Sequence, residues 1–411
     1  MPHEPKESAE STVIEAPRQR HLVLVVHQSA ELYGSDRSLL DALTGLDRAR
    51  YELVVCLPEE GPLKEVLIAA QFEVHVVPLA KIERRMISPR GLFILPAAIH
   101  RAISALDRVV AGRRVDIVYS NTLAVLGGAA WARKMRLPHV WHVREIVRRP
   151  ALASFIFRHL ARWGSTCTIS NSHSTLEWIS GQREPTPRAR VVWNGFEAAH
   201  SRTDDRRANK QQLGFDPDKP LILMVGRVNA WKGQDLLVEA LGDLCRRAVT
   251  GWEAAIVGGP PPGREDLIQS LRAQIGASPA TAQIRTIAFT QDVACYYAAA
   301  DLLVVPSREP EPFGRVAIEA MAYGLPVVAA RHGGLPEIVE EGQTGLLFHP
   351  NEASSLADAL ANLIAAPNKL EAMGHAARER QQKLFSLSAY HAGMNAVFSD
   401  MLAAQAMRST T

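Results

Sequence analysis

Short apolar runs rich in β-branched residues recur through the first half of the chain, and amphipathic helical patterns such as residues 63–70 separate them. Runs of this kind, bounded by turn residues, predict strands that are buried on both faces of a sheet. Because such strands alternate with helices, the pattern predicts a parallel, doubly wound α/β sheet. The expected strands of this half are His21–Val26, Leu53–Leu57, Val74–Val77, Asp116–Tyr119, His139–His142, Cys167–Ser170 and Arg190–Trp193.

The same alternation starts again after a polar stretch at residues 198–219. Its expected strands are Leu221–Val225, Glu253–Val257, Ile284–Ile287, Leu302–Val305 and Pro326–Ala329. Two Rossmann-like, doubly wound domains that face each other form a cleft, which is the usual place for a ligand. The predicted organisation is a disordered lead-in over 1–20, a first domain over 21–197, a linker over 198–219, a second domain over 220–385, and a C-terminal helix over 386–411 that packs back on the first domain.

The composition agrees with a folded protein of two ordinary domains. The chain has 411 residues, of which 47% are hydrophobic and 22% charged, so it can bury a sizeable core. Its apolar runs are far too short to span a bilayer, and residues 1–20 lack the apolar core of a signal peptide, so we expect a cytoplasmic protein. The four cysteines are dispersed among apolar neighbours, which predicts buried, reduced thiols and neither a disulfide nor a metal site.

Positive charge is concentrated between residues 80 and 165, where 16 lysines and arginines stand against four acidic residues. Large apolar side chains, among them Phe155 and Trp163, are interleaved with these charges. Two interpretations are open: solvated helix faces with arginine stems lying along the surface, or a site for an anionic acceptor or an anionic membrane surface. A membrane site would place the protein peripherally on the inner face of the membrane. Nucleic acid is not expected as a partner, because no recognised binding motif accompanies the charge.

The segment from Glu311 to Ala322 is the most informative for chemistry, because it holds two carboxylates, Glu311 and Glu319. If a helix begins near Gly314, Glu311 lies on the loop before it and Glu319 on its second turn, so both carboxylates can face one cleft. Free amides at a helix start form an anion site, and carboxylates accept hydrogen bonds from sugar and ribose hydroxyls. The segment therefore predicts a site for a nucleotide-sugar.

A loop directly after the expected strand Leu221–Val225 adds two cations to this picture. Gly226 permits a tight turn, and Arg227 and Lys232 lie on either side of a short loop. They can grip two phosphates, the arginine through its fork and the lysine as a point charge. Alone, these two residues would be ordinary surface cations, but together with the two carboxylates they favour a diphosphate site.

With these residues the chain resembles the retaining glycosyltransferases of the GT-B fold, specifically family 4, over roughly residues 21–400. The marks of the resemblance are a Gly-Arg…Lys-Gly loop, a pair of glutamates, an apolar run that ends in a serine, and a glycine-rich turn. They are found at Gly226, Arg227, Lys232, Gly233, Glu311, Glu319, Ser307 and His332–Glu337. The segment Val191–Gly195 is similar to an interdomain motif of the family, with Trp193 where a proline is common.

The resemblance implies a role for each matching residue. Arg227 and Lys232 would neutralise the diphosphate leaving group, Glu319 would bind the ribose, and Glu311 would hold a hydroxyl of the donor sugar. His142, at the end of a strand of the first domain, would also contact the donor sugar. Backbone groups that complete the donor site would come from Gly34, Phe313, Gly314, Arg315 and Val316. The loop at Gly34 departs from the usual Gly-Gly of the family, because Tyr33 precedes the glycine.

A full expectation of function follows from the resemblance. It implies transfer of a hexosyl group, with retention, from a UDP- or GDP-sugar held by the second domain to a saccharide or lipid-linked acceptor on the first. It implies no cofactor and no metal, and the pair Asp216 and Asp218 lies in the polar stretch before a strand, where a metal site is not expected.

Other functions stay open beside this one. A nucleotide-sugar epimerase or another enzyme of the same fold would share much of the site, and a carbohydrate-binding relic could lack catalysis. A dinucleotide-dependent oxidoreductase is disfavoured, because three prolines interrupt the nearest glycine-rich run, Val257–Gly263.

Overall fold

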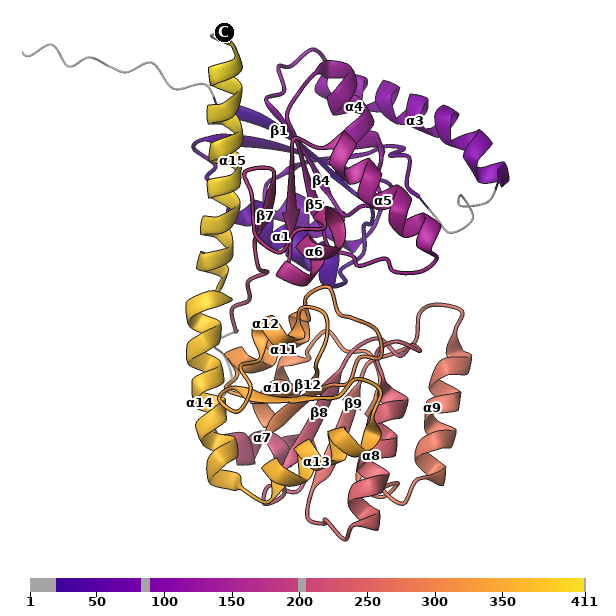
Figure 1. The fold of residues 1–411 in the computed structure, drawn as a ribbon, viewed down its shortest axis with the longest axis vertical. Coiled ribbons are helices and arrows are strands. Elements are labelled where there is room, and N and C mark those ends of the chain that lie inside the picture. The colour runs from indigo at the N-terminus through magenta and orange to yellow at the C-terminus, as the bar shows by residue number, and fades with distance from the viewer. Residues whose placement is uncertain (1–19, 83–88, 199–204, 410–411) are drawn as a thin grey trace, which may run out of the picture.

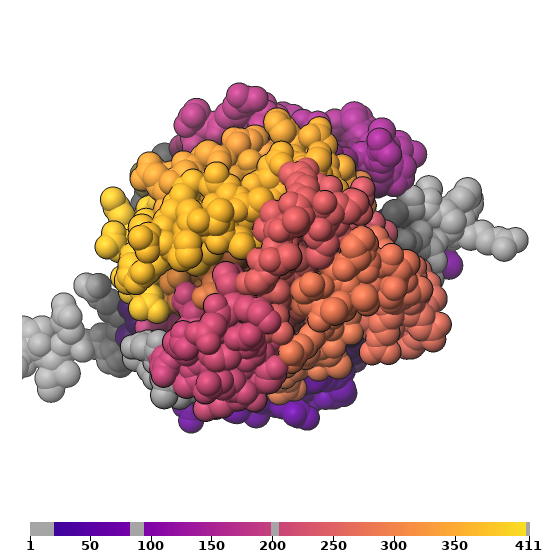
Figure 2. All heavy atoms as spheres, turned by 90° about the horizontal axis from the view of Figure 1, so that it is seen from below, coloured from indigo at the N-terminus to yellow at the C-terminus, as the bar shows by residue number. Residues whose placement is uncertain are grey.

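The computed structural model describes residues 20–82, 89–198 and 205–409 and shows two α/β domains stacked along the long axis of the molecule (Figure 1). Each domain contains one parallel sheet with helices packed around it, which confirms the predicted fold class. Seen from below, the second domain fills the view and the first domain appears only at its rim (Figure 2). Most of the expected lead-in, residues 1–19, lies outside the described residues.

The first sheet has seven strands in the order β3-β2-β1-β4-β5-β6-β7. The order reverses between β1 and β4, and open α/β sheets bind ligands outside the carboxyl ends of their strands at such a point. The strands are β1 His21–His27, β2 Tyr51–Leu57, β3 Glu73–Val76, β4 Ile117–Asn121, β5 His139–Val143, β6 Cys167–Ser170 and β7 Ala189–Val191. The helices are α1 Gly34–Thr44, α2 Pro62–Ala69, α3 Pro89–Val110, α4 Gly127–Met135, α5 Ala151–Gly164 and α6 His173–Ser180.

The second sheet has six strands in the order β10-β9-β8-β11-β12-β13, and its order reverses between β8 and β11. The strands are β8 Leu221–Val225, β9 Glu253–Val257, β10 Ile284–Ile287, β11 Leu302–Val305, β12 Val327–Ala330 and β13 Gly345–Phe348. The helices are α7 Arg206–Gln212, α8 Gln234–Arg246, α9 Glu265–Ala277, α10 Ala294–Ala299, α11 Arg315–Ala322, α12 Leu335–Ile338, α13 Ala353–Ile364 and α14 Pro367–Leu384. The apolar pattern does not predict β13, because this short edge strand leaves Leu346 and Leu347 only partly buried.

Side-chain alternation along β1 explains why this strand is apolar throughout. Val23 and Val25 point into a core shared with α1 and with the C-terminal helix α15 (Leu387–Ser409). Leu22, Leu24 and Val26 point to the opposite face, where they join a core with α3 and α4. A central strand covered by helices on both faces therefore needs apolar residues at every position.

The polar stretch expected as a linker contains the helix α7, so the linker expectation does not extend to residues 206–212. The carboxylate of Asp205 caps this helix by accepting a hydrogen bond from the amide of Ala208 at 3.1 Å. Lys210 is buried and its ammonium lies 2.6 Å from the carboxylate of Asp301, in the second domain. The charges in this stretch reflect a short helix anchored through ion pairs, which composition alone does not distinguish from a linker.

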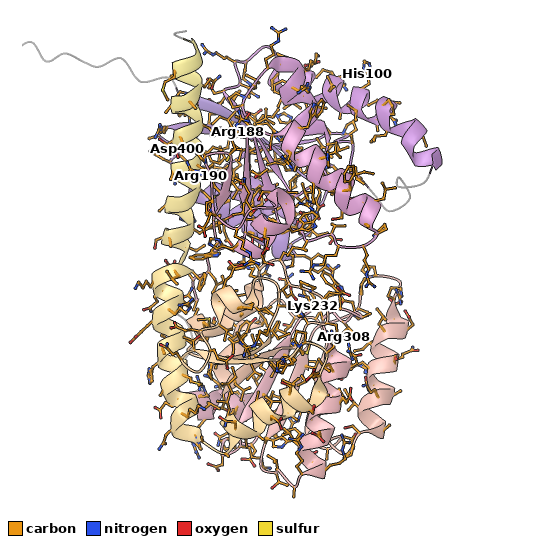
Figure 3. All side chains as sticks on the ribbon, viewed as in Figure 1. His100, Arg188, Arg190, Lys232, Arg308 and Asp400 are labelled. Atoms are coloured by element: carbon orange, nitrogen blue, oxygen red, sulfur yellow. The ribbon has the colours of Figure 1, made fainter. Side chains whose placement is uncertain are left out.

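The chain ends by returning from the second domain to the first. Helices α14 and α15 form a long column beside both domains (Figure 1). On α15, Tyr390, Met394 and Phe398 are buried in the core of the first domain, and the ring of Phe398 meets that of Tyr119 in an edge contact at 5.5 Å. An ion pair between Arg190 of β7 and Asp400 at 2.8 Å fastens the far part of the helix (Figure 3).

Two further features of the structure are the state of the cysteines and the length and apolar character of the helices. The four cysteines, which all lie within the described residues, form no disulfide, and burial raises the pKa of Cys56 to about 12 and of Cys167 to about 11. These two thiols are therefore structural and unreactive at neutral pH. Within the described part of the chain, no helix combines the length and apolar character required to cross a bilayer.

We predict that the stability of the protein depends on the absence of a side chain at Gly195, where the chain leaves the first domain and passes close to the start of α15. A Cβ atom there would lie 2.6 Å from the carbonyl oxygen of Ser386 and 2.8 Å from the Cβ of Tyr390. Gly195→Ala should therefore lower the free energy of unfolding by about 1–3 kcal/mol, the usual cost of overpacking. Urea denaturation measures the effect. Gly276→Ala is the matched control, because nothing lies within 4 Å of its Cβ position, and equal stability of the two variants would contradict the prediction.

Candidate nucleotide-sugar site

A cleft of about 650 Å³ lies between the two domains and receives residues from both. The first domain contributes the loop before α1 and the end of β5, and the second contributes the loops after β8 and β9 and the start of α11. Both sheets therefore present carboxyl ends of their strands to one space. The charged residues that line it are five cations and two carboxylates, namely Arg37, Arg144, Arg227, Lys232, Arg315, Glu311 and Glu319. An excess of positive charge suits an anionic ligand.

The loop after β8 places Lys232 at the edge of the second domain that faces the first (Figure 3). The side-chain oxygen of Asn229 accepts hydrogen bonds from the amides of Trp231 and Lys232, at 3.2 and 3.0 Å, and so closes the loop. Gly233 ends it with φ +78°, and a Cβ atom there would collide with the carbonyl oxygen of Pro306. The positive φ at Gly233 is strained for any side chain, which explains why the loop ends in glycine.

The buried Glu311 and the partly buried Lys232 form an ion pair, with 2.6 Å between the Lys232 ammonium and one Glu311 oxygen. The hydroxyl of Ser307 donates to the same oxygen at 2.5 Å. Burial by itself would raise the pKa of Glu311, but the charge and hydrogen bond of Lys232 and the hydrogen bond of Ser307 lower it below its ordinary value. Gly333 packs against the Glu311 backbone so closely that a Cβ atom would collide with it. The two predicted residues are thus brought together, and Glu311 is ionised.

The helix α11 begins where the sequence predicts, with Gly314 at its N-cap in the left-handed region, at φ +106°. The side chain of Phe313 is buried in the core, so only its backbone can serve the cleft. Arg315 and Val316 occupy the first turn, where amides have no partner within the helix. Glu319 follows on the second turn and lines the cleft, where it accepts hydrogen bonds from Arg315 at 2.8 Å and Tyr297 at 3.0 Å.

The side chain of Arg315 has a role that the sequence does not reveal. Its guanidinium reaches across to α1, with hydrogen bonds to Ser38 at 3.0 Å and Asp41 at 2.8 Å, while it also binds Glu319. A second bridge is formed by the Glu337 carboxylate, which accepts from the amides of His173 and Ser174 at the start of α6. A carboxylate at a helix N-terminus is favourable. The Glu337 contact and the ion pair of Arg315 with Asp41 therefore both hold the two domains next to each other.

The loop at Gly34 lies on the opposite wall of the cleft. A Cβ atom at Gly34 would meet nothing within 4 Å, so the fold itself does not require a glycine there. Tyr33, which interrupts the expected Gly-Gly, makes a contact between the domains: the Arg227 guanidinium lies 3.9 Å above its ring, and the ring of Phe289 lies 6.3 Å away. Cation–π contacts of this kind are modest but favourable. Arg227 is therefore held at the mouth of the cleft by an aromatic residue of the other domain.

His142 is fully buried and is not among the residues that line the cleft. Its Nδ1 lies 2.8 Å from the Tyr119 hydroxyl and 3.3 Å from the Arg144 guanidinium. Because arginine can only donate, Nδ1 is the acceptor. Burial, and next the charge of Arg144, lower the pKa of His142 well below its ordinary value, so the ring is neutral and carries its proton on Nε2. That Nε2 donor is buried and has no partner within the described residues.

A buried polar network that the sequence did not point to connects this histidine with the loop at Gly34. The Arg144 Nε donates to the side-chain oxygen of Asn121 at 2.6 Å. The amide of Asn121 therefore faces Nδ1 of His27 at 3.0 Å, and His27 Nε2 lies 2.7 Å from the Asp36 carboxylate in the first turn of α1. The four residues are buried. Their only sequence signal is position, since each follows or ends a strand at the carboxyl edge of the sheet or starts the next helix.

The described residues contain no group of three or more His, Cys, Asp or Glu side chains arranged to hold a metal ion. Asp216 pairs with Lys219 at 3.0 Å and Asp218 with Arg207 at 2.6 Å, and neither aspartate lines the cleft between the domains.

Comparison with known proteins connects this geometry with a class of enzymes. The fold matches HepE of Anabaena, crystallised with UDP-glucose, with a TM-score of 0.77 and 26% identity over 92% of this chain and 99% of that chain. Sucrose-phosphate synthase of Thermosynechococcus elongatus, at 22% identity, shares the fold with a TM-score of 0.74 over 94% of this chain and 100% of that chain. The two domains thus have the GT-B arrangement of glycosyltransferases.

Two family models cover most of the chain. The model of Glycosyltransferase Family 4 matches residues 33–200, and that of Glycosyl transferases group 1 matches residues 205–380. The chain belongs to the group 1 glycosyltransferases. It is 39% identical to the D-inositol 3-phosphate glycosyltransferase of Nocardia farcinica over 271 residues, which are 64% of this chain and 56% of that protein. The chain spans about half the length of the curated relatives it matches.

From the ion pair of Lys232 and Glu311 we predict how the free energy of unfolding changes with pH. With Lys232 in place, the lowered pKa of Glu311 contributes stability above about pH 4.3, and this contribution is lost as pH falls through the folded pKa. In Lys232→Met only burial and weaker partners remain, so the pKa of Glu311 should rise and the ionised carboxylate should destabilise the fold. We expect a loss of about 2 kcal/mol or more near pH 8.

That loss should shrink as the pH is lowered to about 5, because protonation then removes the unpaired charge. Urea denaturation at the two pH values measures it. The control is the double variant with Glu311→Gln, which should recover most of the stability at the higher pH. A loss that is independent of pH, or a double variant as unstable as the single one, would mean that the pair is not electrostatically coupled.

Proposed function

We propose that this protein is a retaining glycosyltransferase that transfers a hexosyl group from a nucleoside diphosphate sugar to a hydroxyl of a polar acceptor. The observation that carries the proposal is the convergence of Arg227, Lys232 and the first amides of α11 with the two carboxylates Glu311 and Glu319 in one cleft. The cations and amides suit a diphosphate. The carboxylates suit the hydroxyls of a ribose and a sugar on either side of it.

UDP is the first donor to consider. HepE, which is 26% identical to this chain, was crystallised with UDP and with UDP-glucose. In the cleft, Phe289 is an exposed aromatic ring beside Thr290, on which a base could stack. Stacking of a base on such a ring is favourable without choosing the base. A GDP-sugar is therefore the alternative donor.

The proposed reaction needs charge stabilisation more than acid–base groups. The bond between C1 of the sugar and the diphosphate oxygen breaks, the acceptor oxygen bonds to C1, and the acceptor proton passes to the leaving diphosphate. Negative charge grows on the leaving group, where Arg227, Lys232 and the α11 amides would stabilise it. Glu311 and Glu319 are both tied to cations. This suits hydroxyl binding better than nucleophilic attack, in keeping with front-face transfer and retention.

The acceptor would bind on the first domain, and we infer that this domain also docks on an anionic membrane. Helix α5 contains no acidic residue, and it exposes Leu152, Phe155 and Trp163, each of which is more than half accessible to solvent. Arg162 is exposed on the same helix and Arg149 just before it. Apolar side chains flanked by arginines suit the interface of an anionic bilayer, where each cation contributes about 1 kcal/mol.

The proposal predicts selective stabilisation by one nucleoside diphosphate. A ligand at about 100 times its dissociation constant adds about 2.7 kcal/mol of stability, enough to raise the melting temperature by a few degrees. Thermal unfolding with UDP, GDP, ADP or dTDP should show this for one nucleotide, with UDP expected first. Glu319→Ala should weaken that binding by about tenfold, or about 1.4 kcal/mol. Glu340→Ala removes a carboxylate outside the cleft and should leave binding unchanged.

Turnover then separates catalysis from binding alone. Release of the nucleotide from its sugar donor should depend on an added acceptor and should fall by about tenfold or more in Lys232→Ala. If no diphosphate stabilises the protein, the nucleotide-sugar site is wrong. Binding without acceptor-dependent release for any saccharide, polyol or lipid acceptor would favour a carbohydrate-binding relic.

The membrane proposal predicts binding to anionic vesicles that depends on salt and on α5. Sedimentation with phosphatidylcholine–phosphatidylglycerol vesicles should capture the protein at low salt and less of it at high salt, because screening weakens the attraction. Leu152→Ser combined with Phe155→Ser should reduce capture further. Ile68→Ser, which removes a half-exposed aliphatic side chain of α2, is the control. Equal capture of both variants would show that α5 does not dock.

A further inference from the structure

Arg144 is a buried cation that lines the cleft and that the proposed transfer chemistry does not use. It lies just past the end of β5, and 8% of its surface is exposed. Four acceptors hold its guanidinium: Asn121 at 2.6 Å, Asn194 at 2.5 Å, Tyr390 at 2.8 Å and His142 at 3.3 Å. They come from β4, the segment between the domains, α15 and β5, so the side chain has one fixed position.

These four acceptors carry no negative charge. Two are asparagine side chains, and burial raises the pKa of Tyr390, whose phenol therefore stays protonated. His142 is neutral as described above. In the described part of the chain the guanidinium makes no ion pair with a carboxylate: Glu145, its neighbour, accepts instead from the backbone amides of Leu123 and Arg144. The side-chain hydrogen bonds of the guanidinium therefore all go to neutral groups, although its charge also acts on the nearby carboxyl of Glu145, whose pKa burial raises and this charge partly lowers.

The hydrogen bonds of Arg144 anchor its guanidinium without neutralising its charge. A guanidinium has five N–H donors. Nε and one hydrogen of Nη1 are used by the two asparagines, and both hydrogens of Nη2 are used by Tyr390 and His142. The hydroxyl of Tyr119 is a further hydrogen-bond partner of the group. Because the residue lines the cleft, its positive charge is available to a ligand there.

We propose that Arg144 is an anion-binding residue and that the group it binds is a phosphate or carboxylate on the acceptor. A buried cation without a counter-ion is costly, and an anion that reaches it in a low-dielectric wall is attracted far more strongly than in water. The assignment of the anion to an acceptor rests on the proposed function, whereas the anion site itself is inferred from the surroundings of Arg144.

Position favours the acceptor over the donor as the source of the anion. Arg144 lies on the wall of the first domain beside Ser38, Asn171 and Asn194, which are neutral hydrogen-bonding residues. The two cations suited to the donor diphosphate, Arg227 and Lys232, lie on the wall of the second domain. A donor held there has cations and helix amides of its own, which leaves the charge of Arg144 for a second anionic group. We therefore expect an acidic acceptor rather than a neutral sugar.

A structural role is the competing explanation, because Asn194 and Tyr390 connect Arg144 to the two segments that cross between the domains. The experiment must therefore separate anion binding from folding. The variants are Arg144→Gln, which removes the charge, and Tyr390→Phe, which removes one hydrogen bond of the same network and keeps the charge. The probe is inorganic phosphate, titrated by calorimetry at constant ionic strength into protein with and without saturating UDP.

The expected result is phosphate binding to the UDP-saturated protein, weakened by about tenfold in Arg144→Gln and nearly unchanged in Tyr390→Phe. If phosphate and UDP compete, and Arg144→Gln weakens UDP itself, Arg144 binds the donor, and the assignment of its anion to the acceptor is overturned. If Arg144→Gln and the wild type bind phosphate and UDP equally, Arg144 is a structural clamp and the proposal is overturned.

Two further readouts keep the test decisive. If Arg144→Gln does not fold, Arg144→Lys replaces it, because a lysine keeps the charge but not the geometry of the fork. Because the charge is kept, phosphate binding to this variant within a few-fold of the wild type would support the proposal, and absence of phosphate binding to either protein would overturn it. If UDP fails to bind the wild type, the proposed function fails, while the titration without UDP still decides whether Arg144 binds an anion.

Discussion

The burial of α15 against the first domain holds the two parallel sheets with their carboxyl edges facing each other. This helix continues the column of α14 from the second domain, and its apolar residues complete one face of the first sheet. Gly195 lets the outgoing chain pass close beneath the start of α15, and Glu337 and Arg315 connect the domains across the cleft. Each wall of the cleft is built by one sheet, so every functional contact between the walls depends on this packing.

The cations in the cleft are held in fixed positions by their present partners, which suits the binding of an anion. Lys232 is paired with Glu311, Arg315 with Glu319 and Asp41, and Arg227 lies on the ring of Tyr33. A diphosphate would have to share these cations with their present partners, which reduces affinity but keeps each side chain in one geometry. Such preorganisation is what charge stabilisation in a transition state requires. Arg144 differs, because its partners are neutral and leave its charge to a ligand.

The two walls have different characters, and the proposals divide accordingly. The second domain offers paired cations and helix amides for a nucleotide-sugar. The first domain offers, within the cleft, a buried arginine whose hydrogen-bond acceptors are neutral and, on α5 and just before it, arginines among exposed apolar side chains. Of the basic residues between positions 80 and 165, Arg144 lies in the cleft and Arg149 and Arg162 lie beside or on α5, whereas Arg113 and Lys134 pair with acidic residues elsewhere on the first domain. Arg84 and Arg85 of that stretch lie outside the described residues.

Local pattern determined most of the fold and half of the site. Apolar runs bounded by turns located twelve of the strands, because a strand covered on both faces needs no partner to be recognised. The glutamate pair and the loop from Gly226 to Gly233 could be read because glycine positions and helix-start spacing are local properties. The edge strand β13 and the helix α7 were missed, because the first is only partly buried and the second is anchored by a lysine ion pair rather than by an apolar stripe.

Only the tertiary structure decided what each charge faces. The sequence by itself determined two doubly wound domains and the glutamates, arginine and lysine of a diphosphate site. It did not reveal that Lys232 is paired with Glu311, that Arg315 reaches α1, or that Arg144 is surrounded by neutral acceptors. Most of these contacts join residues 23 to 274 positions apart, and the strength of an electrostatic contact depends on burial and on every neighbouring dipole. A local sequence pattern specifies neither the burial of a contact nor the dipoles around it, so the chemistry of these side chains follows only from the tertiary structure.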